Sequence, residues 1–505
     1  MPKLPGMLMS NSAVACATCV LIFLTFIPLS FLRFAFLDDY PYMVIHAYRA
    51  INPFLIGDGR PLGGLSAVAL FTIFDTVSSA AFLRLIGLFE LIAVLFLVQR
   101  AAVMAGLDAI WAAFVAIAFA TAPSIQHWVV WGVSSWQLPA LIFGVAAYFP
   151  WRYLVDADGR VSVVNVAWFM ALPLVGMLIY QPFATAAWPL IAIDVMMRRE
   201  NGFPYRKLFV ALVAFCAMLL LTFAISKILI VSLVPSDGKV GRIAIVGVRD
   251  LPAKLDWFLR VPLTTALTPL HVHGSAVVAS VVSSVILIGL AMSSRSVGDF
   301  GLALLLMLCV LVLSNLPSLV PPENTVIRSH VVLALQVFAM LSLSLQMLTR
   351  RMKSSRPVLV AAVVSCCLAM SVWAGSTVVR YNAFPQALEL VLIEGELAKT
   401  KMPEDIPLVL VGLPHGSSLT GRYCDDTDMM GCASSQQRSA LPNIVRLWMR
   451  AHGIDPARYK LMFMHTREDP QAVSFEHARA AIVAAPDKGY FLDLGGVVLQ
   501  HRTPR

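Results

Sequence analysis

Long runs of apolar residues follow one another through the first three quarters of the chain. The hydrocarbon core of a bilayer requires about 20 apolar residues per helix. Eleven runs are long enough to be read as spans, at residues 13–37, 80–98, 104–122, 134–150, 162–180, 184–197, 208–234, 275–292, 299–319, 329–348 and 357–376. Gln181-Pro182 predicts a break, and hence a tight hairpin, between the fifth run and the short sixth run. The pattern predicts a polytopic α-helical membrane protein with about eleven transmembrane helices.

Residues 377–505 have a different pattern. Short apolar stretches at 408–413, 459–464 and 490–500 predict strands, and residues 443–452 and 475–485 predict helices. Alternation of strands and helices is typical of a small α/β domain. We therefore expect a transmembrane domain over residues 1–376 and an α/β domain over residues 377–505.

Composition excludes several classes of protein. Hydrophobic residues make up 59% of the chain and charged residues 13%, about half of the roughly 25% usual in soluble domains. A water-soluble enzyme, a disordered chain and a disulfide scaffold are excluded. The net charge of +9 lies wholly in residues 1–376. Such an excess marks cytoplasmic loops or contact with anionic membrane lipid, and it does not suggest nucleic acid as a partner.

The positions of the basic loops also predict the orientation of the protein in the membrane. The two densest clusters of Lys and Arg lie at 198–207 and 350–356, and both are cytoplasmic if the N-terminus is cytoplasmic. An odd number of spans then places residues 377–505 outside. In a bacterium this means an inner-membrane protein with a periplasmic C-terminal domain.

Two of the eight cysteines lie in that domain. Cys424 and Cys432 flank an acidic loop, Asp425-Asp426-Thr427-Asp428. In an oxidising compartment we expect a disulfide across the loop, and a metal site formed by the three aspartates is the alternative. The pair His271 and His273 lacks a third ligand nearby, so we expect no metal site there.

The first outside loop, residues 38–64, carries the most informative polar residues. Asp38 and Asp39 follow the first apolar run directly, and charged groups at membrane depth are usually functional. The pKa of a carboxylate near the hydrocarbon boundary is raised, which suits a general base that acts on a hydroxyl. Neighbouring side chains diverge, so one carboxylate can face a cavity while the other anchors the turn. The alternative is a solvated pair at the helix end, with Asp39 capping the next helix.

The rest of this loop predicts a phosphate site. Residues 42–56 suit a helix on the membrane surface, and residues 62–74 are apolar but too short to span. Between them, the turn Gly57–Pro61 presents the guanidinium of Arg60 at the interface. An arginine can bind phosphate oxygens with two parallel hydrogen bonds, so the loop suits a lipid-borne phosphate.

Other outside segments add candidates. For the donor phosphate they are Lys239 and Arg242 in a basic loop, Arg328 at a helix start where the macrodipole disfavours it, and Lys227 near the outer end of a span. A solvated flap is the alternative for the basic loop. The candidates for binding the sugar or the acceptor, which include residues of the loop 38–64, are Tyr40, Tyr42, His46, His127, Trp131 and His271. An aromatic belt at the membrane surface explains Trp128, Trp131 and Trp136 equally well.

Asp38-Asp39, followed about 20 residues later by Gly59-Arg60-Pro61-Leu62, resembles the type II serotype-converting O-antigen glucosyltransferases of bacterial inner membranes. These belong to the GT-C-fold glycosyltransferases, which use polyprenyl-phosphate sugars. The resemblance implies a GT-C-like glycosyltransferase domain over 1–376 with the catalytic loop 38–64. It implies an inverting transfer to a glycan or glycolipid acceptor such as the O-antigen of lipopolysaccharide. Asp38 would be the general base, Arg60 would hold the phosphate, and no metal or other cofactor would be needed.

The resemblance further implies a functional partnership with a donor-synthesising glycosyltransferase and a flippase. The main alternative is that the protein itself is a transporter or flippase of a lipid-linked sugar, and a membrane acyltransferase is a third possibility. Transporters place their charges near the bilayer midplane and often contain repeats. Here the charges gather at the outer edge, which favours the transferase.

Overall fold

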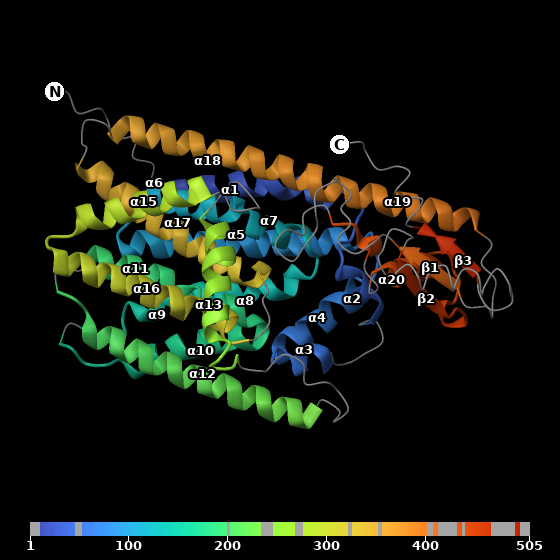
Figure 1. Ribbon diagram of the computed structural model, residues 1–505, viewed down its shortest axis with the longest axis horizontal. Coiled ribbons are helices and arrows are strands. Elements are labelled where there is room, and N and C mark those ends of the chain that lie inside the picture. The colour runs from blue at the N-terminus through green and yellow to red at the C-terminus, as the bar shows by residue number, and fades with distance from the viewer. Residues whose placement is uncertain are drawn as a thin grey trace.

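Helices form nearly all of the structure, which is a computed structural model. The structure describes residues 11–45, 53–156, 158–198, 202–233, 246–267, 276–321, 326–351, 356–400, 408–412, 432–436, 440–465 and 490–494. Long helices run side by side, and a small sheet lies beyond one end of the bundle (Figure 1). The helices before residue 200 are α1 Asn11–Phe26, α2 Asp39–Ile45, α3 Pro53–Gly57, α4 Pro61–Ile73, α5 Ala80–Ala105, α6 Ala109–Thr121, α7 Pro123–Val130, α8 Ser134–Ala146, α9 Tyr148–Trp151, α10 Val163–Tyr180 and α11 Ala187–Arg198. The later ones are α12 Tyr205–Leu233, α13 Leu251–Phe258, α14 Thr264–Ala266, α15 Ala276–Ser293, α16 Val297–Leu319, α17 Val326–Arg351, α18 Arg356–Val378, α19 Phe384–Lys399 and α20 Leu441–Ala451.

The bundle is that of a multi-pass membrane protein, as predicted. Seven helical segments in the described chain are long and apolar enough to cross a membrane, or eight if α6 and α7 form one bent span. Each of the eleven predicted runs coincides with a helix. The difference in number arises partly because α8 has 13 residues and α11 has 12, fewer than the about 20 that a straight crossing requires.

Two breaks shape the centre of the bundle. The predicted break at Gln181 is confirmed, because residues Gln181–Phe183 form a short 3-10 turn between α10 and α11. A second break separates α6 from α7, whose axes differ by 60°. Ala122 is extended before Pro123, the first residue of α7, as expected for a residue that precedes proline. Every residue of α7 is buried, so this short helix lies inside the bundle.

The C-terminal part is reached through one long helical segment. Helix α18 continues through a π-helical turn, Val379–Ala383, into α19, so the predicted domain boundary at 376/377 falls within continuous helix. The strands β1 Leu408–Gly412, β2 Leu461–His465 and β3 Tyr490–Asp493 form a parallel sheet in the order β2-β1-β3.

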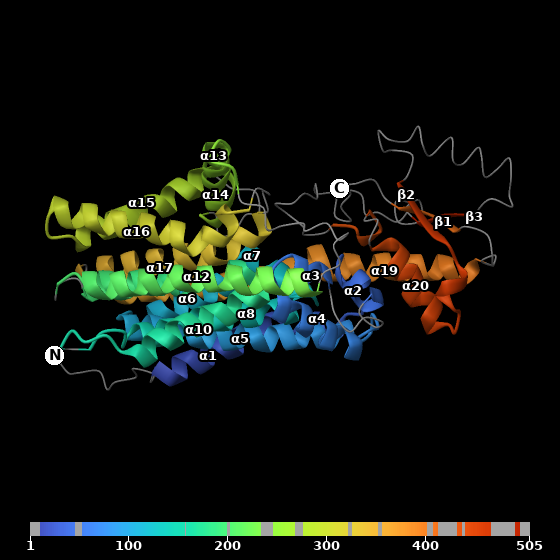
Figure 2. The same cartoon turned by 90° about the horizontal axis from the view of Figure 1, so that it is seen from below.

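The sheet agrees with the three predicted strands where the chain is described. Helix α20 coincides with the predicted helix at 443–452, while the predicted helix at 475–485 lies outside the described residues. Both views place the sheet and α20 at the end of the bundle where α2 and α4 lie (Figures 1 and 2). The acidic pair and the C-terminal elements therefore occupy the same end of the molecule.

Helix α4 packs closely on its neighbours through Gly63. A Cβ atom at this position would lie 2.5 Å from the carbonyl oxygen of Ile179 and 2.7 Å from the ring of Trp136. Both neighbours are held in the interior, so neither can move away cheaply. The absence of a side chain at residue 63 therefore sets the distance between α4 and α10.

We predict that Gly63→Ala destabilises the protein by about 1–3 kcal/mol, because overpacking strains a filled core. The matched control is Gly57→Ala, since a Cβ atom at Gly57 would meet nothing within 4 Å. Thermal unfolding in detergent checks the pair. Equal midpoints for both variants would contradict the proposed close approach of α4 and α10.

Candidate functional site

The carboxylate of Asp39 joins two distant loops. It is fully buried and accepts hydrogen bonds from the backbone N–H groups of Phe36 (2.9 Å), Gly132 (3.1 Å) and Val133 (2.8 Å). A Cβ atom at Gly132 would lie 3.1 Å from Asp39 Oδ1, so glycine leaves room for the carboxylate. Burial raises the pKa of Asp39 to about 6, although the three N–H donors oppose the shift. Asp39 is thus the anchor of the turn that follows α1.

Arg84 of α5 holds the chain that leads to this turn. Its buried guanidinium donates to the carbonyl oxygens of Phe34 (2.6 Å), Leu32 (2.6 Å) and Leu29 (3.2 Å), and it lies 3.8 Å from the centre of the Phe34 ring. Leu29 lies in the 3-10 helix Ile27–Phe31 that follows α1, and Leu32 and Phe34 lie just beyond its end. Arg84 was not among the candidates predicted from the sequence. Its signal was a charged residue inside an apolar run, where a charge costs free energy unless it has polar partners.

The backbone between these contacts is unusual at Leu37. Its φ angle is 41°, and it is the one non-glycine residue in the described chain with a positive φ. This conformation costs about 1–2 kcal/mol for a residue with a Cβ atom, and Leu37 is also fully buried. The two residues that follow differ in exposure: Asp39 is buried, while Asp38 is half-buried.

Arg60 is buried rather than presented at the interface, which corrects the prediction for its turn. Its Nε donates to Gln181 Oε1 (2.9 Å), its guanidinium lies 4.7 Å from the centre of the Tyr180 ring, and Nη1 is 3.7 Å from Asp58 Oδ2. Gln181 in turn donates to the carbonyl oxygens of Asp58 (3.1 Å) and Gly59 (2.9 Å). These partners offset the cost of removing the cation from water, and they explain the inward orientation.

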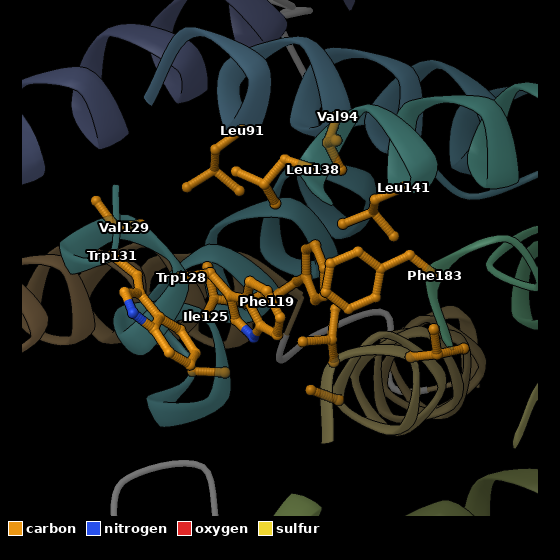
Figure 3. Close-up of a cluster of buried hydrophobic side chains, with 14 of the residues drawn as sticks. Leu91, Val94, Phe119, Ile125, Trp128, Val129, Trp131, Leu138, Leu141 and Phe183 are labelled. Carbon is orange, nitrogen blue, oxygen red and sulfur yellow. The ribbon is translucent and has the colours of Figure 1, made fainter. Parts of the chain in front are cut away.

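Aromatic side chains connect Arg60 to the region of Asp39. Ring centres are 6.4 Å apart for Tyr42 and Trp136, 6.2 Å for Trp136 and Tyr180, 5.5 Å for Tyr180 and Trp128, and 5.9 Å for Trp128 and Trp131. Figure 3 shows Trp128 and Trp131 among the packed side chains of the core. All three tryptophans are buried. An aromatic belt at the membrane surface is therefore the wrong interpretation of them.

Polar atoms of α7 and its C-cap lie within this aromatic cluster. Trp128 Nε1, Trp131 Nε1 and His127 Nδ1 are buried and have no hydrogen-bond partner among the residues that the structure describes. A buried polar group without a partner costs about 1–3 kcal/mol. These groups are chemically suited to hydrogen-bond with hydroxyl groups, and the role of His127 and Trp131 in binding a sugar or acceptor stays a prediction. Of the remaining candidates here, Tyr40 is fully buried beside Asp39 and Tyr42 packs at 5.3 Å on Phe71.

Of the remaining phosphate and acceptor candidates, Lys227 is the one whose side chain the structure describes. Lys227 is exposed on α12, while its neighbour Ser226 faces Gly59. Arg328 lies in the first turn of α17, but its side chain is outside the described part. Lys239, Arg242, His46 and His271 also lie outside the described residues.

The cysteines and the metal candidates can be placed in part. Cys432 is buried and disulfide-bonded, whereas Cys424 lies outside the described residues. The six cysteines of the membrane part are free. Within the described ranges, no group of three or more His, Cys, Asp and Glu residues could hold a metal ion.

Comparison with known proteins does not give a family for the chain. No family model and no curated protein sequence matches it. What the structure itself defines is a multi-pass helical membrane protein. At one end of its bundle an anchored acidic pair, a buried arginine and a cluster of aromatic residues lie together.

We predict that the stabilising effect of Asp39 depends on pH. The pKa of about 6 in the folded protein lies above the ordinary value of about 3.9, so the folded state binds the proton more tightly than the unfolded state. The free energy of unfolding should therefore fall, by up to about 3 kcal/mol, as the pH rises from 4 to 6. Asp39→Asn cannot titrate, so the stability that it loses relative to wild type should be larger at pH 4.5 than at pH 7.

Thermal midpoints of wild type and Asp39→Asn in detergent at the two pH values measure this difference. Asp75→Asn is the control, because Asp75 is a half-buried carboxylate between α4 and α5. A loss that is larger at pH 7 would mean that the three N–H donors outweigh burial.

Proposed function

We propose that the protein is an inner-membrane glycosyltransferase that moves a sugar from a polyprenyl-phosphate donor to a periplasmic glycan. One observation carries the proposal. The half-buried Asp38 adjoins a carboxylate fixed by three backbone N–H groups, at the end of the bundle that also holds the buried Arg60 and its aromatic neighbours. A base and a cation at a membrane boundary are the two groups that transfer from a lipid phosphate requires.

In this proposal Asp38 takes the proton from an acceptor hydroxyl. The acceptor oxygen then forms a bond with the anomeric carbon, and the bond between that carbon and the phosphate oxygen breaks on the opposite face. The sugar configuration is inverted, and the lipid phosphate leaves with the electron pair. Arg60 stabilises the charge that develops on the phosphate.

Basic contacts at the far end of the bundle support the proposed orientation. Asp194 at the end of α11 accepts from Arg152 (2.9 Å) and Arg198 (2.7 Å). Arg350 and Arg356 lie 3.5 and 3.3 Å from Asp108. Helix α18 begins at this end, whereas α19 ends beside the sheet (Figure 1). Since arginines mark cytoplasmic loops, we propose eleven spans, a cytoplasmic N-terminus and a periplasmic α/β domain.

We predict that Asp38→Asn lowers the rate of sugar transfer at least about 100-fold, as expected on removal of a general base, and leaves folding intact. The assay uses the purified protein in liposomes with a panel of polyprenyl-phosphate hexoses and pentoses. Mass spectrometry of the acceptor glycan detects the added sugar. The matched control is Asp75→Asn, which removes another half-buried carboxylate, between α4 and α5.

Full activity of Asp38→Asn would exclude Asp38 as the base. Movement of the donor across the liposome membrane, without formation of a new glycosidic bond, would instead favour the transporter alternative.

We predict that Arg60→Lys lowers kcat/KM for the donor by roughly 10- to 150-fold. The substitution keeps the charge but removes the planar fork, and a hydrogen bond to a charged group contributes about 1.5–3 kcal/mol. Arg260→Lys is the matched control. Arg260 forms an exposed pair with Asp256 at 2.7 Å, and such pairs contribute at most about 1 kcal/mol. Unchanged donor kinetics in Arg60→Lys would limit Arg60 to a structural role.

A further inference from the structure

The C-terminal part of the chain reaches the backbone of the acidic turn through one serine. The N–H of Leu37 donates to Ser434 Oγ at 3.4 Å. Ser434 Oγ donates in turn to Gln386 Oε1 at 2.8 Å, and the N–H of Ser434 donates to Glu389 Oε2 at 2.9 Å. A short chain of hydrogen bonds therefore connects α19 to the residue that precedes Asp38.

This chain of hydrogen bonds lies in the interior. Ser434 and Gln386 are fully buried, and Glu389 is 2% exposed. Gln386 Nε2 also donates to the carbonyl oxygen of Cys432, and Cys432 is disulfide-bonded. Hydrogen bonds are stronger away from water, and a satisfied buried network fixes the positions of its members. The segment 432–436 therefore presents Ser434 to Leu37 in a single orientation.

Leu37 is the residue at which such support is needed. Its positive φ angle is unfavourable for a residue with a Cβ atom and persists only where the surroundings impose it. A second contact from α19 acts on the same stretch, because Glu394 binds Arg33 through both carboxylate oxygens. Helix α19 and the segment that it holds thus contact both ends of residues 33–37, just before the acidic pair.

We infer that Ser434 is a positioning residue for Asp38, and that the C-terminal region completes the acidic site by fixing the turn at Leu37. This inference rests on the proposed function for the role of Asp38 as a base. It gives the C-terminal region a role that the membrane helices cannot supply alone. Arg84 and Asp39 tie the turn to the bundle, and Ser434 ties it to the C-terminal region.

Hydrogen exchange tests the positioning without any assumption about activity. Ser434→Ala should accelerate amide exchange in the peptide that covers residues 34–42. Gln386→Met, which removes the partner of the Ser434 hydroxyl at similar volume, should do the same. The control is Ser376→Ala, because Ser376 is an exposed serine of α18 whose hydroxyl bonds only to Trp373. Unchanged exchange in both Ser434→Ala and Gln386→Met would overturn the inference.

Transfer kinetics then test the link to Asp38. Misplacement of a catalytic group by about 1 Å costs on the order of 100-fold. We therefore expect Ser434→Ala to lower kcat 10- to 100-fold with KM for the donor unchanged, while the protein remains folded at the temperature of the assay. In the Asp38→Asn background Ser434→Ala should have no further effect, because a positioning residue acts through the group that it positions. Equal losses in both backgrounds would overturn the inference. If the wild-type protein transfers no sugar, the proposed function fails, and the exchange measurement alone decides whether Ser434 holds the turn.

Discussion

The three backbone hydrogen bonds to the Asp39 carboxylate are the constraint on which the end of the bundle that holds the acidic pair depends. A carboxylate buried to this extent is unfavourable unless polar groups replace the water that it loses. Here Phe36 supplies one N–H group from the chain after α1, and Gly132 and Val133 supply two from the loop before α8. The interaction therefore fixes two loops that are nearly a hundred residues apart in the sequence. Loss of the carboxylate would leave three buried donors unsatisfied at once.

Other interactions at this end act on the same short stretch of chain. Arg84 occupies carbonyl groups of the chain that follows α1, and Ser434 contacts the amide of Leu37. Each partner comes from a different part of the sequence: α5, the loop before α8, and the segment after α19. Because the turn is fixed from several directions, an unfavourable backbone conformation at Leu37 can be maintained. Such fixed geometry is what a catalytic group requires before its substrate arrives.

Features of the fold that depend on the local sequence pattern could be predicted. Apolar runs correctly located the helices, because a lipid-facing helix needs a continuous apolar surface. The break at Gln181-Pro182 followed from the geometry of proline. The direction of side chains was less predictable, because in a membrane helix both the lipid side and the protein side are apolar. For this reason Trp136 could be read as a surface residue, and Arg60 was expected at the interface.

Local sequence patterns could not predict contacts between residues that are far apart in the chain. The contact between Leu37 and Ser434 joins residues 397 positions apart, and no local pattern marks Ser434 as special. Arg84 carried a signal, as a charge in an apolar run, but its partners are carbonyl groups that every residue possesses. Only the three-dimensional arrangement shows that Arg84 reaches these carbonyls. The sequence also did not show that, of the candidate phosphate ligands Arg60 and Lys227, the first is buried and the second exposed.

The structure gives two neighbouring carboxylates different surroundings. Asp39 is surrounded by donors and sealed from solvent, so it is suited to hold the turn and poorly suited to exchange protons with a substrate. Asp38 is half-buried, and under the proposed function it is the carboxylate that meets the acceptor hydroxyl. The dipeptide would then divide two roles, with Asp39 holding the fold and Asp38 acting as the base. Substitution of either residue should impair function, but through different quantities: the chemical step for Asp38, and the stability of the turn for Asp39. A measurement of activity alone would confuse the two roles, whereas activity and folding measured together can assign them.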